Sequence, residues 1–171
     1  MNRQRLFCIG MLLISLMALA GCTKAPVEPP SEVMDYQVKL YYVNEEAVIS
    51  GDDSQGVLMP VEEMTIASTP DEIQLAVVEA LKTVPAKEHY GTMVAENLKI
   101  NQVYTKDGTA FVDLSIENLN GSSTQETLLI SQIVKSLRES FPEVAQVQFL
   151  VDGDVVESLM GHMAADQPFT E

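Results

Sequence analysis

The two histidines, His89 and His162, are the side chains best suited to acid–base chemistry near neutral pH. His162 could act as a catalytic base with Asp154 or Asp166, which lie close to it in the sequence. No Gly-x-Ser-x-Gly motif accompanies it, so we favour a packed histidine that hydrogen-bonds the backbone. His89 lies in a polar segment and is expected to be solvated.

Adjacent carboxylates are a second candidate for catalysis, and they occur at Glu45-Glu46, Asp52-Asp53, Glu62-Glu63 and Asp71-Glu72. Glycosidase chemistry needs two carboxylates that face each other across a cleft, with the pKa of one raised by burial. In a chain with 25 acidic residues, the spacing of these pairs does not indicate that arrangement. A calcium site at Asp52-Asp53 or Asp152-Gly153-Asp154 is a disfavoured alternative, because the EF-hand pattern is absent. We expect no catalytic residue, no metal and no cofactor.

The N-terminus is typical of an export signal. Arg3 and Arg5 precede an apolar run over residues 6–20, which is shorter than the about 20 residues that a membrane helix needs. This pattern predicts a signal peptide over residues 1–21. An uncleaved anchor or an ordinary secretory peptide is the alternative.

Cys22 is the residue with the clearest predicted chemistry. Leu19-Ala20-Gly21-Cys22 resembles the lipobox of bacterial lipoproteins, which implies cleavage before Cys22 and a diacylglyceryl group on its sulfur. Cys8 leaves with the leader, so the mature chain keeps no thiol for a disulfide, a zinc site or a nucleophile. The resemblance predicts attachment to a membrane through lipid on Cys22.

The mature chain is strongly acidic. Removal of residues 1–21 takes away two of the ten basic residues and leaves 150 residues with a net charge of −17. Such a surface repels nucleic-acid phosphates, so we expect no nucleic-acid partner. A basic protein partner fits this charge. Residues 22–35 are rich in proline and predict a tether, which leaves residues 36–171 as one globular domain.

The elements that must position any site follow from periodicity and turn residues. Residues 36–43 predict a strand, residues 44–55 a loop, and residues 57–66 a short edge strand that Pro60 interrupts. Residues 99–115 predict a hairpin that turns at Asp107-Gly108.

Two helices complete the pattern. Thr69 and Glu72 predict a capping box for a helix that Pro85 ends. Ser123 and Glu126 predict a second box, for a helix that Pro142 ends before a final strand. The order strand, helix, hairpin, helix, strand predicts an α+β fold, with a single mixed β-sheet and two helices packed on one face.

This arrangement resembles the GerMN domain family, which is named from a spore-germination protein. The likeness covers roughly residues 36–169. It is carried by Leu40-Tyr41-Tyr42-Val43-Asn44, Gly108-Thr109-Ala110-Phe111-Val112-Asp113-Leu114-Ser115, Val144-Ala145-Gln146-Val147-Gln148-Phe149-Leu150-Val151-Asp152-Gly153 and Gly161-His162. The resemblance implies a fold of the ring-building type, no enzymatic activity, and a relation to modules that help assemble sporulation machinery in the envelope.

Three functions are compatible with these features. The first is a non-catalytic assembly or scaffolding module that docks on an envelope protein and serves sporulation, germination or envelope maintenance. The second is a lipoprotein that binds peptidoglycan, another wall glycan or a small ligand; the absence of Trp and the count of five Tyr and five Phe disfavour it. The third is a hydrolase that depends on His162. In each case we expect an extracytoplasmic protein on the outer face of the cell membrane, or on an outer membrane if there are two membranes.

Overall fold

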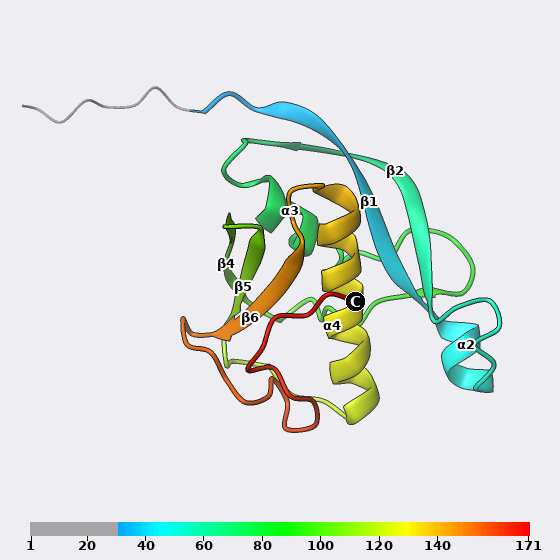
Figure 1. The fold of residues 1–171 in the computed structure, drawn as a ribbon. Coiled ribbons are helices and arrows are strands. Elements are labelled where there is room, and N and C mark those ends of the chain that lie inside the picture. The colour runs from blue at the N-terminus through cyan, green and yellow to red at the C-terminus, as the bar shows by residue number, and fades with distance from the viewer. Residues whose placement is uncertain (1–30) are drawn as a thin grey trace, which may run out of the picture. The chain divides into compact units, whose positions relative to one another are not determined.

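The computed structural model describes residues 31–171 (Figure 1). The predicted signal peptide, the lipidation site Cys22 and most of the tether lie outside these residues. The elements in chain order are β1 (Met34–Asn44), α2 (Glu45–Ser50), β2 (Leu58–Ser68), α3 (Ile73–Ala80), β3 (Tyr90–Gly91), β4 (Ile100–Lys106), β5 (Thr109–Leu114), α4 (Ser123–Ser140) and β6 (Gln146–Val151). Within residues 31–171, no helix combines the length and the apolar composition that crossing a bilayer requires.

The α+β class is confirmed, but the prediction of a single mixed sheet is wrong. The strands form two three-stranded sheets, with the orders β2-β1-β3 and β4-β5-β6. The β4–β5 hairpin is antiparallel, and β6 runs parallel to β5 because α4 connects them. Helices α3 and α4 contact strands of both sheets, so they do not cover one face of a single sheet.

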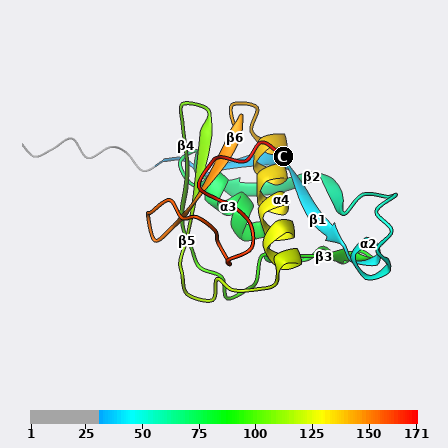
Figure 2. The same ribbon diagram turned by 60° about the horizontal axis from the view of Figure 1, so that its bottom comes forward.

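The sheets stay separate because α4 lies between β1 and β6, as two views show (Figures 1 and 2). The backbone N–H groups of Tyr41 and Lys39 donate to Ser136 Oγ (2.9 Å) and Ser140 Oγ (3.0 Å) of this helix. Serines four residues apart share one helix face, and residues two apart on a strand share one edge. The helix therefore provides hydrogen-bond acceptors for backbone N–H groups on one edge of β1, where another strand could otherwise pair.

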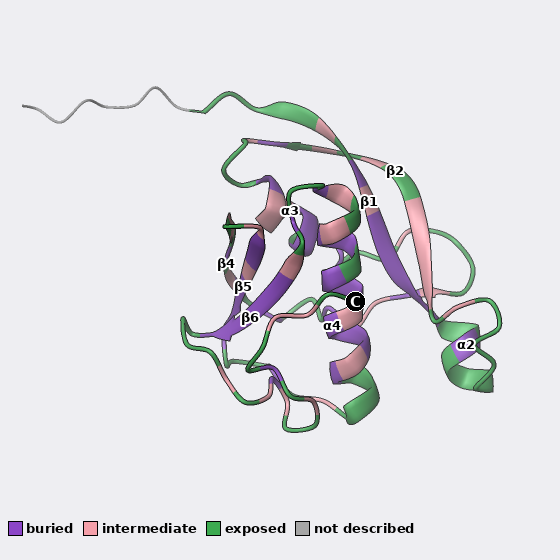
Figure 3. Ribbon diagram, in the orientation of Figure 1, coloured by how far each residue is buried: buried purple, intermediate pink, exposed green. Residues whose placement is uncertain are grey.

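The core lies where the helices meet the two sheets (Figure 3). It contains the buried faces of both sheets and of the two longer helices, including Leu40, Val77, Ile133 and Phe149. Tyr42 is fully buried as well, and its hydroxyl donates to the carbonyl oxygen of Thr83 (3.1 Å). Residues 31–171 therefore form one compact unit with a continuous core.

Several predicted boundaries shift. The first helix begins at Ile73, after a turn in which Thr69 Oγ1 donates to Glu72 Oε2 (3.2 Å), and it ends at Ala80 instead of Val84. The second helix has Ser122 as its N-cap, and Ser122 forms the capping box with Gln125 in place of the predicted Ser123–Glu126 pair.

The segment expected to be a loop and a short strand is more regular than predicted. Residues Glu45–Ser50 form helix α2, whose N-cap Asn44 accepts from Ala47 N (3.3 Å). Strand β2 is 11 residues long, and it accommodates Pro60 because it lies at the edge of its sheet. The predicted turn at Asp107-Gly108 is confirmed, with φ angles of 51° and 77°.

Candidate functional site

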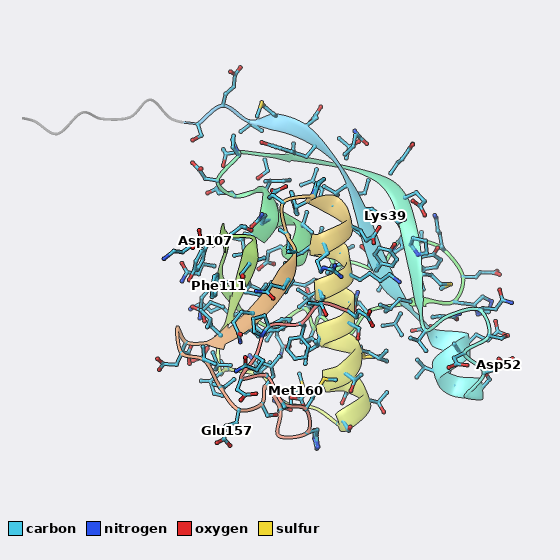
Figure 4. All side chains as sticks on the ribbon, viewed as in Figure 1. Lys39, Asp52, Asp107, Phe111, Glu157 and Met160 are labelled. Atoms are coloured by element: carbon cyan, nitrogen blue, oxygen red, sulfur yellow. The ribbon has the colours of Figure 1, made fainter. Side chains whose placement is uncertain are left out.

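The carboxylate of Glu126 joins the N-terminal end of α4 to the loop that contains His162. Glu126 Oε1 accepts hydrogen bonds from Ser158 Oγ (2.8 Å), Leu159 N (3.0 Å) and Met160 N (2.9 Å), and Oε2 accepts one from His162 N (2.9 Å). Figure 4 shows Met160 in the loop beside this end of the helix. The fully buried Glu126 carboxylate thus fixes the loop of residues 158–162 to α4.

The electrostatics of Glu126 suit this structural role. Burial by itself raises the pKa of a carboxyl group, but the four hydrogen bonds outweigh it and hold the pKa of Glu126 below its ordinary value of 4.5. The carboxylate is therefore ionised at neutral pH. A group that holds its negative charge so strongly is a poor general acid or base near pH 7.

His162 is not assembled into a catalytic pair with the predicted aspartates. Its exposed ring lies with Nε2 3.2 Å from the carbonyl oxygen of Gly121, the backbone contact that the sequence favoured. Within the described part of the chain, neither Asp154 nor Asp166 hydrogen-bonds this ring. His89 is exposed, as expected, with Nδ1 3.7 Å from Glu46 Oε2.

Both segments considered for calcium contain an aspartate that accepts a backbone hydrogen bond. Asp52 Oδ1 accepts from Ser54 N (3.0 Å), and the carboxylate of Asp152 accepts from Ile116 N (3.3 Å). Among residues 31–171, no three His, Cys, Asp or Glu side chains lie together in a way that could hold a metal ion.

Two adjoining hollows lie along α4, and together we call them the α4 groove. One hollow, of about 430 Å³, is lined by Gly56, Val57, Leu58, Ser131, Lys135, Arg138, Glu139 and Glu171. The other, of about 360 Å³, is lined by Val48, Val57, Ser123, Thr124, Thr127 and Leu128. Val57 lines both hollows, so they adjoin at this residue.

The exposed face of α4 is one wall of the groove. Thr124, Thr127, Ser131, Lys135 and Arg138 follow each other at intervals of three or four residues, so they share one helix face. Their order places uncharged side chains at the N-terminal part of this wall and the cations Lys135 and Arg138 at its C-terminal part, where Glu139 and Glu171 also line the hollow.

Across from α4 lies an apolar lip, which consists of Val48, Ile49 and Val57; Val48 and Val57 line the groove, and Ile49 lines a neighbouring hollow of about 240 Å³ with Val48. The side chain of Ile49 is 85% exposed, and those of Val48 and Val57 are 37% and 40% exposed. Most of α2 is exposed except Ala47, so the lip stands clear of the core (Figure 3). Neighbouring exposed apolar side chains beside a hollow are typical of a surface that binds another molecule.

The charged end of the groove is organised around Tyr41. Lys135 Nζ lies 4.7 Å and Lys39 Nζ 5.4 Å from the centre of its ring, which are cation–π distances. The Tyr41 hydroxyl and the Glu62 carboxylate, whose Oε2 is 3.0 Å from Lys39 Nζ, raise the pKa of Lys39 to about 12. Arg138 donates from Nε to the carbonyl oxygen of Ala145 (2.9 Å) and from Nη1 to that of Thr170.

Little in the sequence indicated this groove, because residues 44–55, which carry most of the lip, were expected to be a loop. An isoleucine and two valines in an otherwise acidic segment, Val48, Ile49 and Val57, are the signal that could have located it.

Comparisons with known proteins concern the fold and the family. A family model described as "Germane: Sporulation and spore germination" matches residues 39–157. No curated protein is significantly similar in sequence.

Three solved structures resemble the chain. A Clostridium perfringens protein described as a "putative lipoprotein" is 22% identical with a TM-score of 0.54, and the match covers 81% of this chain and 88% of that one. The first GerMN domain of the sporulation protein GerM from Bacillus subtilis is 16% identical with a TM-score of 0.56, covering 79% and 98%.

The tandem GerMN domains of the same Bacillus subtilis protein are 19% identical with a TM-score of 0.55, and the match covers 80% of this chain and 46% of that one. At these identities the structures establish a shared fold. The family model extends over more than half of the sequence. The chain therefore belongs to the Germane family of sporulation and spore-germination proteins, and its domain is of the GerMN type.

Proposed function

We propose that this protein is a non-catalytic envelope module that binds another protein through the α4 groove and its apolar lip. The observation that carries the proposal is the exposed apolar lip: Val48 and Val57 line a hollow of about 360 Å³, and Ile49, which is 85% exposed, lines a neighbouring hollow of about 240 Å³ together with Val48. Membership of a sporulation and germination family supports a role in that process or in envelope maintenance.

The energetics favour association through the lip. Fully burying an isoleucine side chain contributes about 1.5–3 kcal/mol, and every 1.4 kcal/mol corresponds to about a tenfold change in affinity. The small side chains of Thr124, Thr127 and Ser131 let a partner backbone approach α4 closely. The groove thus combines an apolar anchor with an accessible helix face.

Sheet edges are a less suitable docking surface than the groove. The outer edge of β2 is free of a paired strand within residues 31–171, but it carries Pro60, Glu62 and Glu63. Proline and charged side chains on an edge strand oppose the addition of another strand. Pairing through this strand edge is therefore the weaker route.

The location that we propose is extracytoplasmic, with attachment to a membrane through lipid on Cys22. The likeness to a protein described as a "putative lipoprotein" supports an envelope location. The 12 residues 22–33 before β1 would reach about 37 Å if they were extended like polyproline. The groove could then meet a partner well clear of the lipid head groups.

The test is affinity purification of the full chain from its native cells, with a matched pair of variants. Ile49→Ser removes the most exposed residue of the lip, and Ile116→Ser removes an isoleucine that is 61% exposed but does not line the groove. We expect the captured partner to bind at least tenfold more weakly to Ile49→Ser and unchanged to Ile116→Ser. Equal binding to both variants would contradict the proposal.

Two further measurements separate the competing functions. If the protein sediments with isolated peptidoglycan and affinity purification captures no protein partner, the glycan-binding alternative is favoured. Turnover of a wall substrate that His162→Ala abolishes would favour a hydrolase.

A further inference from the structure

The C-terminal end of the α4 groove concentrates the cations of a strongly acidic molecule. Of the ten basic residues in the sequence, three lie in residues 1–30, which leaves seven in the described part. Three of these seven, Lys39, Lys135 and Arg138, gather around Tyr41 and the adjoining hollow. Glu139 and Glu171 line the same hollow and Glu62 pairs with Lys39, so this end is close to neutral and repels a negatively charged group less than the surrounding acidic surface does.

Lys135 is the cation best placed to receive such a group. Its ammonium lies over the Tyr41 ring, and no carboxylate of residues 31–171 lies within 4.0 Å of it in an ion pair. A cation–π contact uses the charge but leaves N–H donors free for an oxygen acceptor. Lys39 differs, because Glu62 and Glu139 lie 3.0 Å and 3.9 Å from its Nζ.

An acidic side chain of the protein itself already lies at this end. Glu171 lines the same hollow as Lys135 and Arg138, and the carbonyl oxygen of its neighbour Thr170 accepts from Arg138. Glu171 therefore forms part of the wall of this hollow, on the same side as the Arg138–Thr170 contact.

The two hollows set the spacing of the ligand. Thr127 lies at the apolar hollow and Lys135 at the charged one, eight residues along α4, which corresponds to about 12 Å at about 1.5 Å per residue. An extended segment covers this distance in three to four residues at about 3.3 Å each. An apolar side chain against Val48, Val57 and Leu128 would thus place a carboxylate three or four residues away beside Lys135.

We propose that the α4 groove binds an extended segment of a partner protein that carries a large apolar side chain and, three or four residues away, an aspartate or glutamate. The proposal rests on the proposed protein-binding function and specifies the chemistry of the partner. Its carboxylate is bound by Lys135 with help from Arg138, and its apolar side chain fills the hollow beneath the lip.

The test uses the full chain in detergent and a phage-displayed library of random heptapeptides as the probe. We expect selected peptides to share an apolar residue and an acidic residue three or four positions apart. In a binding titration with one selected peptide, Lys135→Glu should weaken binding at least tenfold, and the neutral Lys135→Met several-fold. Lys106→Glu makes the same charge change at an exposed site on the β4–β5 hairpin and should leave affinity within twofold.

Two further variants test the geometry. Thr127→Trp fills the apolar hollow and should abolish binding, whereas Glu171→Gln removes the competing carboxylate and should strengthen binding two- to threefold. Circular dichroism of each variant shows whether its fold is retained.

Several outcomes would overturn the proposal: no selected peptide, peptides without an acidic residue, equal effects at positions 135 and 106, or displacement of the peptide by a peptidoglycan stem peptide. If partner capture still depends on Ile49 in those cases, only the carboxylate assignment fails. If dependence on Ile49 is lost as well, the proposed protein-binding function fails with it.

Discussion

At the scale of single residues, Glu126 shows how a buried charge can be structural. Its carboxylate is fully buried, and its hydrogen-bond partners are one hydroxyl and three backbone N–H groups of the loop at residues 158–162. Charge-assisted hydrogen bonds to backbone N–H groups are among the stronger ones in proteins. The loop depends on this carboxylate for its attachment to α4.

Replacement of Glu126 by glutamine should therefore destabilise the fold strongly. The amide NH₂ cannot accept a hydrogen bond, so at least one buried N–H donor loses its partner, and we expect the free energy of unfolding to fall by roughly 3 kcal/mol. Glu117→Gln, at an exposed position, should change it by less than about 0.5 kcal/mol. Urea denaturation compares the variants, and equal stabilities would refute the role given to Glu126.

The contribution of Glu126 should also depend on pH. Because its pKa is lowered in the folded state, the unfolded state binds more protons as the pH falls. The contribution is complete above the unfolded-state value of 4.5 and is lost as the pH falls through the folded-state pKa. The stability difference between wild type and Glu126→Gln should be constant from about pH 8 to about pH 6 and shrink below 4.5. A stability difference that grows as the pH falls would contradict this prediction.

At the scale of elements, helix α4 is joined to β1 through its serine side chains. Ser136→Ala leaves the backbone N–H of Tyr41 without its acceptor in a buried environment, which should cost about 1–3 kcal/mol of unfolding free energy. Ser131→Ala, on the groove face of the same helix, should be neutral to within about 0.5 kcal/mol. Chemical denaturation measures both, and a neutral Ser136→Ala would show that the contact adds nothing.

The same helix shows where sequence patterns reach their limit. Ser122-x-x-Gln125 and Ser123-x-x-Glu126 both fit the capping-box pattern, so the sequence alone could not choose between them. The choice follows from tertiary structure, because the loop at residues 158–162 takes the carboxylate of Glu126. Local patterns describe short-range bonds and omit partners more than 30 residues away.

Sheet pairing was mispredicted for a related reason. Alternating side chains identified β1, β5 and β6 as strands, but they carry no information about which strands share hydrogen bonds. The serine contacts of α4 with Lys39 and Tyr41 decide that β1 joins β2 and not the β4–β6 sheet. The hairpin at Asp107-Gly108 was predictable because its turn residues are adjacent in sequence.

At the scale of the whole molecule, the proposed function separates attachment from recognition. Lipid on Cys22 would hold the protein at a membrane, and the α4 groove would select its partner. We expect Cys22→Ser to move the protein from the membrane fraction to the soluble extracytoplasmic fraction, while affinity for the partner in detergent stays unchanged. Fractionation followed by mass spectrometry of the N-terminal peptide measures this, and membrane retention of the unlipidated variant would contradict it.

The most direct test of the central claim is photocrosslinking in living cells. The photoreactive residue p-benzoylphenylalanine is placed at Thr124, an exposed position in the groove, or at Lys106, an exposed position on the β4–β5 hairpin. We predict that position 124 yields one discrete protein adduct, which disappears when Ile49→Ser is added. Position 106 should yield no adduct to the same protein. Adducts of equal yield at both positions, or adducts to wall glycan alone, would contradict it.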